Sequence, residues 1–312
     1  MTALHGKRLS LVLGSGGARG LAHIGVIRWL EEQGCLVESI AGCSMGAMIG
    51  GIHAAGKLDE YEQWVRGIDR KGVFSILDFS FGGGGLVKGE RLMATLRSLV
   101  GETLIEELPV KFTAVAADIV REREVWISRG PLFDAVRASI SMPLFFTPFR
   151  YDGTVLIDGS IFNPVPIAPT YHDLTDLTVA VNLNGPVVPD EEMSQEEQEQ
   201  DQEANGLAAF GARIRKFFGS ARDESVESDE RDWGMLYVLT QSIDAMQGVI
   251  ARQKLAAHPP DFVVDVPRNA CGTLEFDRAE EMIALGYARA RACLGTQFEH
   301  GSGRSGSSLL HG

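Results

Sequence analysis

The amino-acid sequence predicts a three-layer α/β fold, with helices on both faces of a mainly parallel sheet. Two short runs, an apolar one at 9–13 and a β-like one at 37–41, have the length of strands. Each run passes through a glycine-rich turn into a segment with the apolar spacing of a helix. Further strand-like runs follow at 155–157 and 261–266. Strands that alternate with helices in this way are typical of parallel sheets covered by helices.

The first glycine-rich turn, Gly14 to Gly20, joins the first expected strand to a helix. That helix has one apolar side, formed by Leu21, Ile24, Ile27 and Leu30. An acyl-transfer site needs backbone N–H donors about 3 Å from the oxygen that becomes negatively charged. We predict that the N–H groups of Gly16, Gly17 and Ala18 fill this role.

The second turn, Gly42 to Gly46, follows the next expected strand and holds Ser44 between two glycines. The Gly-x-Ser-x-Gly pattern between a strand and a helix allows a sharp reversal, because Gly42 and Gly46 let neighbouring backbone come close. The serine hydroxyl is then exposed at a helix N-terminus, where the helix dipole favours developing negative charge. Successive parallel strands end at the same sheet edge, so the two turns can face one another across a crevice. Ser44 is therefore a candidate nucleophile.

A nucleophilic serine needs a base, and no histidine of the chain has a convincing catalytic setting. His23 and His53 lie in helical patterns, and His258 precedes two prolines; His172 is the least easily dismissed. The remaining histidines are His5, His300 and His311. A carboxylate is the better candidate, because Asp158 ends a short apolar strand. Taken alone, an ordinary Asp-Gly turn is the favoured explanation of Asp158 and Gly159.

Four motifs in a fixed order give the sequence a family resemblance. They are 15–20, 42–46, 138–146, and Asp158-Gly159-Ser160 with Asn163-Pro164. In this order they resemble the motif set of the patatin-like phospholipases, over about residues 8 to 183, and in particular the compact bacterial branch similar to neuropathy target esterase. The resemblance implies a patatin-like hydrolase fold with a Ser-Asp dyad, no catalytic histidine, no cofactor and no metal. It also implies hydrolysis of acyl esters of phospholipids or lysophospholipids.

Carried over by position, the resemblance assigns Ser44 as the nucleophile, Asp158 as the general base, and Gly16, Gly17 and Ala18 as the oxyanion hole. Arg19 either holds the first turn or helps to neutralise a lipid phosphate. Ser15 and Ser160 depart from the family pattern, because the family often has glycine at the first position and glycine or alanine at the second. Both are small residues, so the expected turns remain possible.

Three other functions stay open at this stage. A nucleotide-binding fold would explain the first turn, but Arg19 stands where its third glycine is required. An ordinary α/β-hydrolase would use Ser44, an aspartate and His258, which occur in the right chain order. A regulatory or scaffold protein could keep the fold without catalysis. The nucleotide-binding fold leaves Ser44 and Asp158 unexplained. The ordinary α/β-hydrolase leaves the ordered motifs unexplained.

Composition places most of the acidity in one segment. The formal net charge is −13, and residues 190–232 carry 14 acidic and 5 basic side chains, a net of −9. Two acidic stretches within it bury little surface and are expected to be disordered. Between them an amphipathic helix is expected from Leu207, Phe210, Ile214, Phe217 and Phe218. Four roles remain open for this helix: contact with a lipid surface, coverage of the active site, docking on a second copy, and packing on its own domain.

The remaining segments complete the expected organisation. The run Gly82 to Gly85 predicts a loop, a candidate lid, and not a phosphate loop. An apolar stripe at 236–250 and a pattern at 277–294 predict two more helices. We expect a catalytic domain at 1–187 and 233–298, an insertion at 188–232, and a flexible tail at 299–312.

Cellular context follows from what the sequence lacks. No run of about eighteen apolar residues occurs, and the first residues lack the apolar core of a signal peptide. The four cysteines show neither metal-ligand spacing nor a disulfide pattern, which fits a reducing compartment. We therefore expect a cytoplasmic protein that binds a lipid-like ester and no nucleic acid. Peripheral contact at the inner membrane face and a homodimer remain open.

Overall fold

The computed structural model describes residues 4–76, 78, 87–188 and 235–295. Its strands are β1 (Arg8–Leu13), β2 (Leu36–Cys43), β3 (Lys111–Asp118), β4 (Arg123–Ile127), β5 (Phe149–Tyr151), β6 (Thr154–Asp158), β7 (Leu177–Gly185) and β8 (Phe262–Pro267). Its helices are α1 (Ala22–Glu32), α2 (Met45–Ala54), α3 (Leu58–Arg66), α4 (Arg70–Ile76), α5 (Glu90–Val100), α6 (Leu132–Ser139), α9 (Met235–Ala257) and α10 (Ala279–Ala290). Short 3-10 turns include η1 (Gly17–Leu21) and η3 (Gly159–Ile161).

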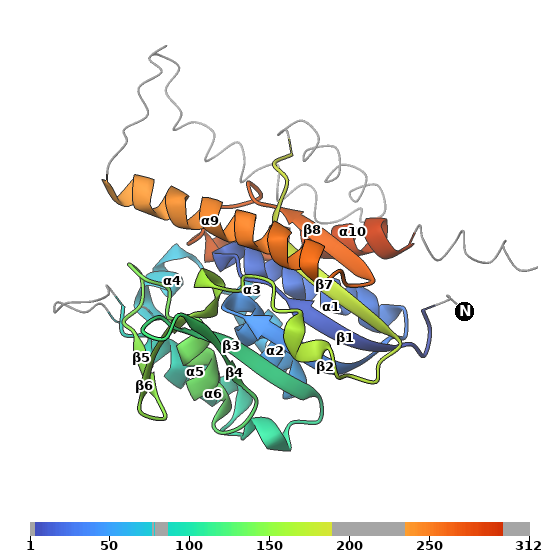
Figure 1. Ribbon diagram of the computed structural model, residues 1–312, viewed down its shortest axis with the longest axis horizontal. Helices are drawn as coiled ribbons and strands as arrows, with labels where there is room; N and C mark the ends of the chain where they lie inside the picture. Colours follow the sequence, from blue (N-terminus) through green and yellow to red (C-terminus); the bar gives the residue numbers. More distant parts are fainter. Residues whose placement is uncertain (1–3, 77, 79–86, 189–234, 296–312) are drawn as a thin grey trace, which may run out of the picture. The chain divides into compact units, whose positions relative to one another are not determined.

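The strands form one mixed sheet, as Figure 1 shows. β8, β7, β1, β2 and β3 pair in this order, and every one of these pairs is parallel. β4 and β6 both pair with β3 in the antiparallel sense, and β5 pairs with β6. The prediction of a mainly parallel sheet in an α/β fold is confirmed.

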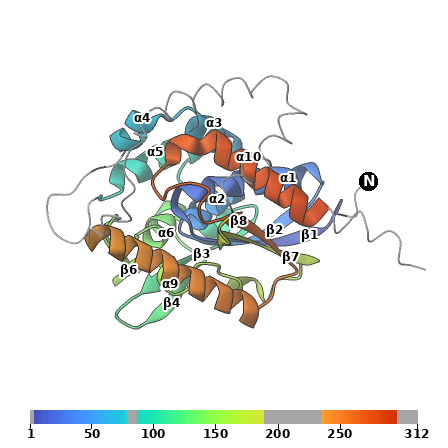
Figure 2. The same ribbon diagram turned by 90° about the horizontal axis from the view of Figure 1, so that it is seen from above.

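Helices cover both faces of this sheet. The larger apolar core joins one face to α1, α2, α6 and α10. On the other face, Ala251 of α9 packs with Val12 of β1 and Ala180 of β7 in a smaller cluster. Figure 2 shows α1 and α10 on one side of the strands and the C-terminal part of α9 on the other. This arrangement gives the three layers that the alternation of strands and helices predicts.

The pairing of β3 brings two strand ends together. Cys43, the last residue of β2, stands opposite Val115, and Asp158, the last residue of β6, stands opposite Ala116. β4 occupies the other edge of β3 at both positions. β2 and β6 therefore meet end to end along one edge of β3, and the residues that follow them become neighbours.

Helix α9 differs from its prediction in the face that it buries. The apolar stripe predicted at 236–250 includes Leu239 and Met246, but their side chains are 44% and 56% exposed. The buried positions are instead Gln247 and Ala251. The expectation that the stripe completes the core is thus wrong for these residues, because α9 turns the side of Gln247 and Ala251 toward the sheet.

The chain divides into two compact units, residues 1–186 with 246–312 and residues 187–245. The second unit includes the first half of α9. The expected lid at 82–85, the amphipathic segment at 207–218 and the tail at 299–312 lie outside the described residues. Among the helices of the described residues, none combines the length and the apolar character needed to cross a membrane.

Candidate active site

Ser44 occupies a strained turn between β2 and α2. Its φ of 55° and ψ of −121° lie in a region that residues with a side chain rarely adopt. The flanking glycines allow this turn, because a Cβ on Gly42 would run into the backbone of Gly46 and Ala47. A Cβ on Gly46 would run into the carbonyl oxygen of Leu13. The predicted glycine roles thus have a direct steric basis.

Ser139, at the end of α6, connects the turn at Ser44 to the sheet through hydrogen bonds. The backbone N–H of Ser44 donates to Ser139 Oγ over 2.9 Å. The Ser139 hydroxyl in turn donates to the carbonyl oxygen of Val115 in β3 over 2.6 Å. Ser139 lies within the third sequence motif, at 138–146, but no local pattern distinguishes it from its neighbours. Its hydrogen bonds fix the backbone of a strained residue to the sheet.

Asp158 lies directly against the serine. Ser44 Oγ donates to Asp158 Oδ2 over 2.6 Å, and the Asp158 side chain is fully buried. The other carboxylate oxygen, Oδ1, accepts from the backbone N–H of Ser160 over 2.8 Å and from Cys43 Sγ over 3.9 Å. The meeting of β2 and β6 along β3 produces this contact between residues far apart in the sequence.

Burial sets the protonation behaviour of Asp158. Loss of water raises the pKa of the carboxyl group from 3.8 to about 6, because burial disfavours the charged form. Hydrogen bonds from Ser44 and Ser160 oppose this rise. A carboxylate with such a pKa is ionised near neutral pH and is a stronger base than an exposed aspartate. It can therefore take a proton from the hydroxyl that it already binds.

The expected oxyanion donors are not equally available. The backbone N–H of Ala18 donates to the carbonyl oxygen of Thr273 over 2.9 Å, so in this structure it is occupied. No described residue accepts a hydrogen bond from the N–H of Gly16 or Gly17. Arg19 is buried, and its Nη1 donates to the carbonyl oxygen of Arg268 over 2.7 Å, which ties the turn to the residues after β8.

Two of the histidines weighed as alternative bases, His23 and His258, have other roles. His23 is fully buried, and burial lowers its pKa to about 4; its Nε2 lies 2.8 Å from the carbonyl oxygen of Gly14. His258 packs edge-on against Tyr171, with 5.1 Å between the ring centres. Tyr171 lies by the beginnings of β7 and β8, at the sheet end opposite Ser44. The alternative of an ordinary α/β-hydrolase with Ser44, an aspartate and His258 as base is therefore wrong for this geometry.

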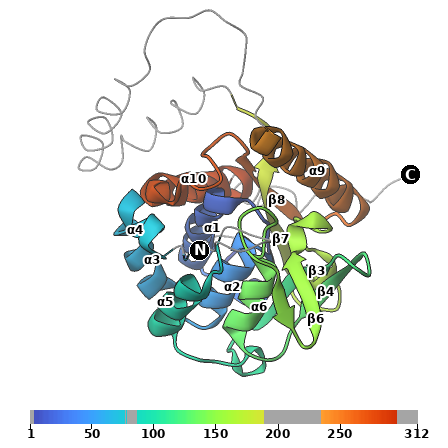
Figure 3. The same ribbon diagram turned by 90° about the vertical axis from the view of Figure 1, so that its left-hand side faces the viewer.

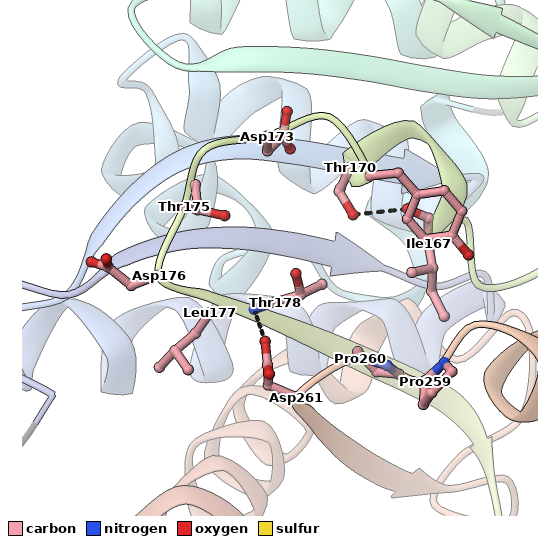
Figure 4. Close-up of a pocket in the computed structure, with 11 residues that line it drawn as sticks. Ile167, Thr170, Asp173, Thr175, Asp176, Leu177, Thr178, Pro259, Pro260 and Asp261 are labelled. Carbon is pink, nitrogen blue, oxygen red and sulfur yellow. Dashed lines mark hydrogen bonds between the residues drawn. The ribbon is translucent and has the colours of Figure 1, made fainter.

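A pocket of about 200 Å³ lies beside Tyr171 (Figure 4). Its acidic side chains are already engaged: Asp173 accepts from Ser10, Asp176 from the N–H of Arg8, and Asp261 from the N–H of Thr178. Neither Ser44 nor Asp158 lines it. The pocket is thus separate from the dyad, and its polar groups are satisfied within the protein.

A second group of polar residues lies near the dyad, and none of them is among the residues predicted for the site. Asn163 Nδ2 and Lys254 Nζ donate to the two carboxylate oxygens of Glu124, over 2.8 and 2.5 Å. Gln247 Nε2 donates to Ser160 Oγ over 2.9 Å. The sequence motif includes Asn163 and Ser160, but Glu124, Gln247 and Lys254 carry no local signal. Figure 3 shows α9, which supplies two of them, alongside the strands. In the part of the chain that the structure describes, no cluster of metal-binding side chains occurs.

Comparison with known proteins gives matches at three levels. A family model described as patatin-like phospholipase matches residues 11–171. A protein of Mycobacterium tuberculosis, named as an uncharacterized NTE family protein, is 37% identical over 98% of this chain and 96% of its own. A protein of Emericella nidulans named as a lysophospholipase is 28% identical over 93% of this chain and 18% of its own. Among solved structures, VipD from Legionella pneumophila has a TM-score of 0.44 and 16% identity, over 95% of this chain and 68% of VipD.

Proposed function

This chain belongs to the patatin-like phospholipase family, and from that premise we propose that it hydrolyses acyl esters of lysophospholipids or phospholipids through a dyad of Ser44 and Asp158. The family assignment confirms the resemblance that the four motifs indicate. The observation that carries the proposed chemistry is the 2.6 Å hydrogen bond from Ser44 Oγ to Asp158 Oδ2. The serine lies on a strained turn, and the base that it contacts is a buried carboxylate, so the hydrogen bond can serve proton transfer.

In the first half of the reaction, Ser44 Oγ attacks the ester carbonyl carbon while Asp158 takes the hydroxyl proton. The carbonyl oxygen becomes negatively charged and receives hydrogen bonds from the N–H groups of Gly16 and Gly17. We leave Ala18 out of this set because its N–H already donates to Thr273. The bond from carbon to the leaving alcohol oxygen then breaks, and Asp158 returns the proton to that oxygen. An acyl-enzyme ester on Ser44 remains.

In the second half, a water molecule attacks the acyl-enzyme while Asp158 takes one of its protons. The bond between the acyl carbon and Ser44 Oγ breaks, and the proton returns to Ser44. The fatty acid leaves and the dyad is restored. One carboxylate thus serves both half-reactions, because each proton that it accepts goes to the oxygen that departs.

The lipid substrate class rests on family membership and on a relative whose name includes lysophospholipase activity. Arg19 is engaged with Arg268, so its favoured role is to hold the first turn and not to bind a phosphate. The catalytic unit in this proposal comprises residues 1–187 and 233–298, with the acidic stretch 188–232 as an insertion.

The test compares release of fatty acid by the wild type, Ser44→Ala and Asp158→Asn from nitrophenyl esters and from phospholipid and lysophospholipid micelles. We expect each substitution to lower turnover at least about a thousandfold without unfolding the protein. Asp152→Asn, an exposed substitution in the turn that leads into β6, is the matched control and should keep full activity. Retention of most activity in Asp158→Asn would refute the dyad.

The same experiment tests the regulatory alternative. A folded wild type that is inert toward every ester would favour a non-catalytic protein on this fold. A fluorophosphonate probe separates a lack of the right substrate from a lack of chemistry, because it reacts with an activated serine without a lipid. Labelling that disappears in Ser44→Ala would support the hydrolase even when no lipid is turned over.

A further inference from the structure

Helix α9 buries a glutamine beside the candidate active site. The Gln247 side chain is only 3% exposed, although an amide loses water contacts on burial and needs partners in return. Four residues further along, Ala251 packs against β1 and β7, and Lys254 reaches Glu124 of β4. This part of α9 is therefore fixed to the sheet by Gln247 and by the residues that follow it.

The contacts of Gln247 lead to the general base in two steps. Its Nε2 donates to Ser160 Oγ over 2.9 Å, and Ser160 is fully buried. The backbone N–H of Ser160 donates to Asp158 Oδ1 over 2.8 Å, while Asp158 Oδ2 accepts from Ser44. A single residue thus separates the α9 amide from the carboxylate.

The direction of these hydrogen bonds constrains the Ser160 hydroxyl. A hydroxyl oxygen accepts with its lone pairs and donates with one hydrogen, which rotates to suit its surroundings. Because Gln247 donates to Ser160 Oγ, the hydroxyl hydrogen must point elsewhere. The carboxylate of Asp158 lies beside the hydroxyl, because Oδ1 accepts from the N–H of the same residue over 2.8 Å, and interaction with the Ser160 side chain lowers the pKa of Asp158. The amide therefore favours the orientation in which Ser160 donates to the carboxylate.

We propose that Gln247 is a positioning residue, which acts through the Ser160 hydroxyl to keep the Asp158 carboxylate ionised and turned toward Ser44. Its consequence for catalysis rests on the proposed function of the dyad. Its consequence for the ionisation of Asp158 does not, because that can be measured on the folded protein alone.

Two other titratable groups near Asp158, Cys43 and Glu124, do not explain a change of activity with pH near 6. Cys43 of β2 lies 3.9 Å away, and burial with the nearby negative charges of Asp158 and Glu124 raises the pKa of its thiol well above the usual range. The thiol therefore stays neutral near pH 6. Glu124 of β4 is held by Lys254 and Asn163, and those bonds lower its pKa, so it stays ionised there. Neither group changes charge where Asp158 does.

The first measurement is the pH dependence of kcat/KM for Gln247→Met, with Gln253→Met as its control. Gln253 is exposed on the same helix, so the same chemical change there leaves the dyad untouched. Loss of a hydrogen bond that favours the ionised form raises the pKa of an acid. We expect the acid limb of Gln247→Met to move up by about half to one pH unit, a threefold to tenfold loss below pH 6 that recovers above pH 8, with KM unchanged. An equal loss at every pH would mean a merely structural role.

The second measurement needs no turnover. The difference in unfolding free energy between proteins with Asp158 and with Asp158→Asn depends on pH through the ionisation of this one group. The midpoint of that dependence should move up in Gln247→Met and in Ser160→Ala by similar amounts. The double variant should move it no further than Ser160→Ala alone, because both act through one hydroxyl.

The two measurements separate the possible failures. If fluorophosphonate labelling does not depend on Ser44, the proposed hydrolase fails, and the stability curves still decide the role of Gln247. If Ser44 is essential but the midpoints coincide in Gln247→Met and wild type, only the positioning role is overturned. Additive shifts in the double variant would also overturn it, since Gln247 would then act independently of Ser160.

Discussion

At the scale of single residues, the dyad is built at the expense of stability. Ser44 adopts a positive φ, which costs about 1–3 kcal/mol for a residue with a side chain. Asp158 is a buried acid whose hydrogen bonds only partly replace the water that it has lost. Ser139 and the glycines around Ser44 stabilise the turn against this strain. Groups held in unfavourable states by their surroundings are characteristic of reactive sites.

The raised pKa of Asp158 predicts the pH dependence of the reaction. The base works only when ionised, so kcat/KM should be constant well above pH 6 and fall about tenfold for each unit below it. A pH profile with a water-soluble nitrophenyl ester measures this, with folding checked by circular dichroism at each pH. An acid limb centred near 4, as for an exposed aspartate, would show that burial does not control the base.

The same pKa predicts that Asp158→Asn stabilises the protein. Because the folded-state pKa of about 6 exceeds the ordinary 3.8, ionisation of Asp158 opposes folding, and stability falls as the pH rises from about 4 to 6. Asparagine has no such dependence. We expect its unfolding free energy to exceed that of the wild type by up to about 3 kcal/mol above pH 6 and by little near pH 4.

Urea unfolding at a series of pH values measures the difference directly. Asp152→Asn provides the control, because it makes the same chemical change at an exposed side chain. An Asp158→Asn protein that is less stable than the wild type at pH 7 would mean that the lost hydrogen bonds outweigh the buried charge.

At the scale of elements, the strand, turn and helix around Ser44 depend on close backbone contact. α2 begins at Met45, and Gly46 lets its first turn pass the carbonyl oxygens at the end of β1. The registers of β2 and β6 on β3 then decide which residues of the two strand ends come into contact. The chemistry of the site thus depends on how three strands pair.

Two glycine substitutions in helices should have opposite effects on stability. Gly46→Ala places a Cβ against the backbone of Leu13 and Gly14, which cannot move easily, and should cost about 1–3 kcal/mol. Gly248→Ala in α9 meets only the Arg252 side chain, at 3.6 Å, and should stabilise by about 0.5–1 kcal/mol through helix propensity. Thermal unfolding of both variants checks the signs. Equal effects would mean that close packing at Gly46 is unimportant.

At the scale of the whole molecule, charge is distributed unevenly. Residues 190–232 carry a net charge of −9 of the total −13, so the remainder has −4. All the contacts described for Ser44 and Asp158 come from residues outside this segment. We predict that the charge of the acidic segment affects which surfaces the protein approaches and leaves the bond-breaking steps unchanged.

Replacement of residues 190–232 by a Gly-Ser linker tests this division. Hydrolysis of a small water-soluble ester should remain unchanged, because every contact described for the dyad is retained. Association with anionic lipid vesicles should increase at low salt, since less negative charge opposes it, and the difference should vanish near 1 M salt. Vesicle sedimentation and ester turnover measure the two effects. Loss of ester turnover would show that the segment contributes to the catalytic unit.

Much of the fold and part of the site could be predicted locally. The glycine-rich turns, Ser44 and Asp158 stand in short motifs whose spacing and residue types carry the signal. The buried face of α9 could not be predicted, because periodicity favours the apolar stripe at Met246 while the sheet accepts Gln247. Ser139 and Gln247 gave no signal either, since each acts through one partner that is distant in sequence.

The α/β class, the family and the two turns follow from short motifs, because these depend on residues close together in the chain. Three contacts depend on the folded protein: Asp158 lies 2.6 Å from Ser44, the N–H of Ala18 is occupied by Thr273, and Gln247 reaches Ser160. Strand register and helix packing set these distances between segments. Local propensity and spacing contain no record of those distances.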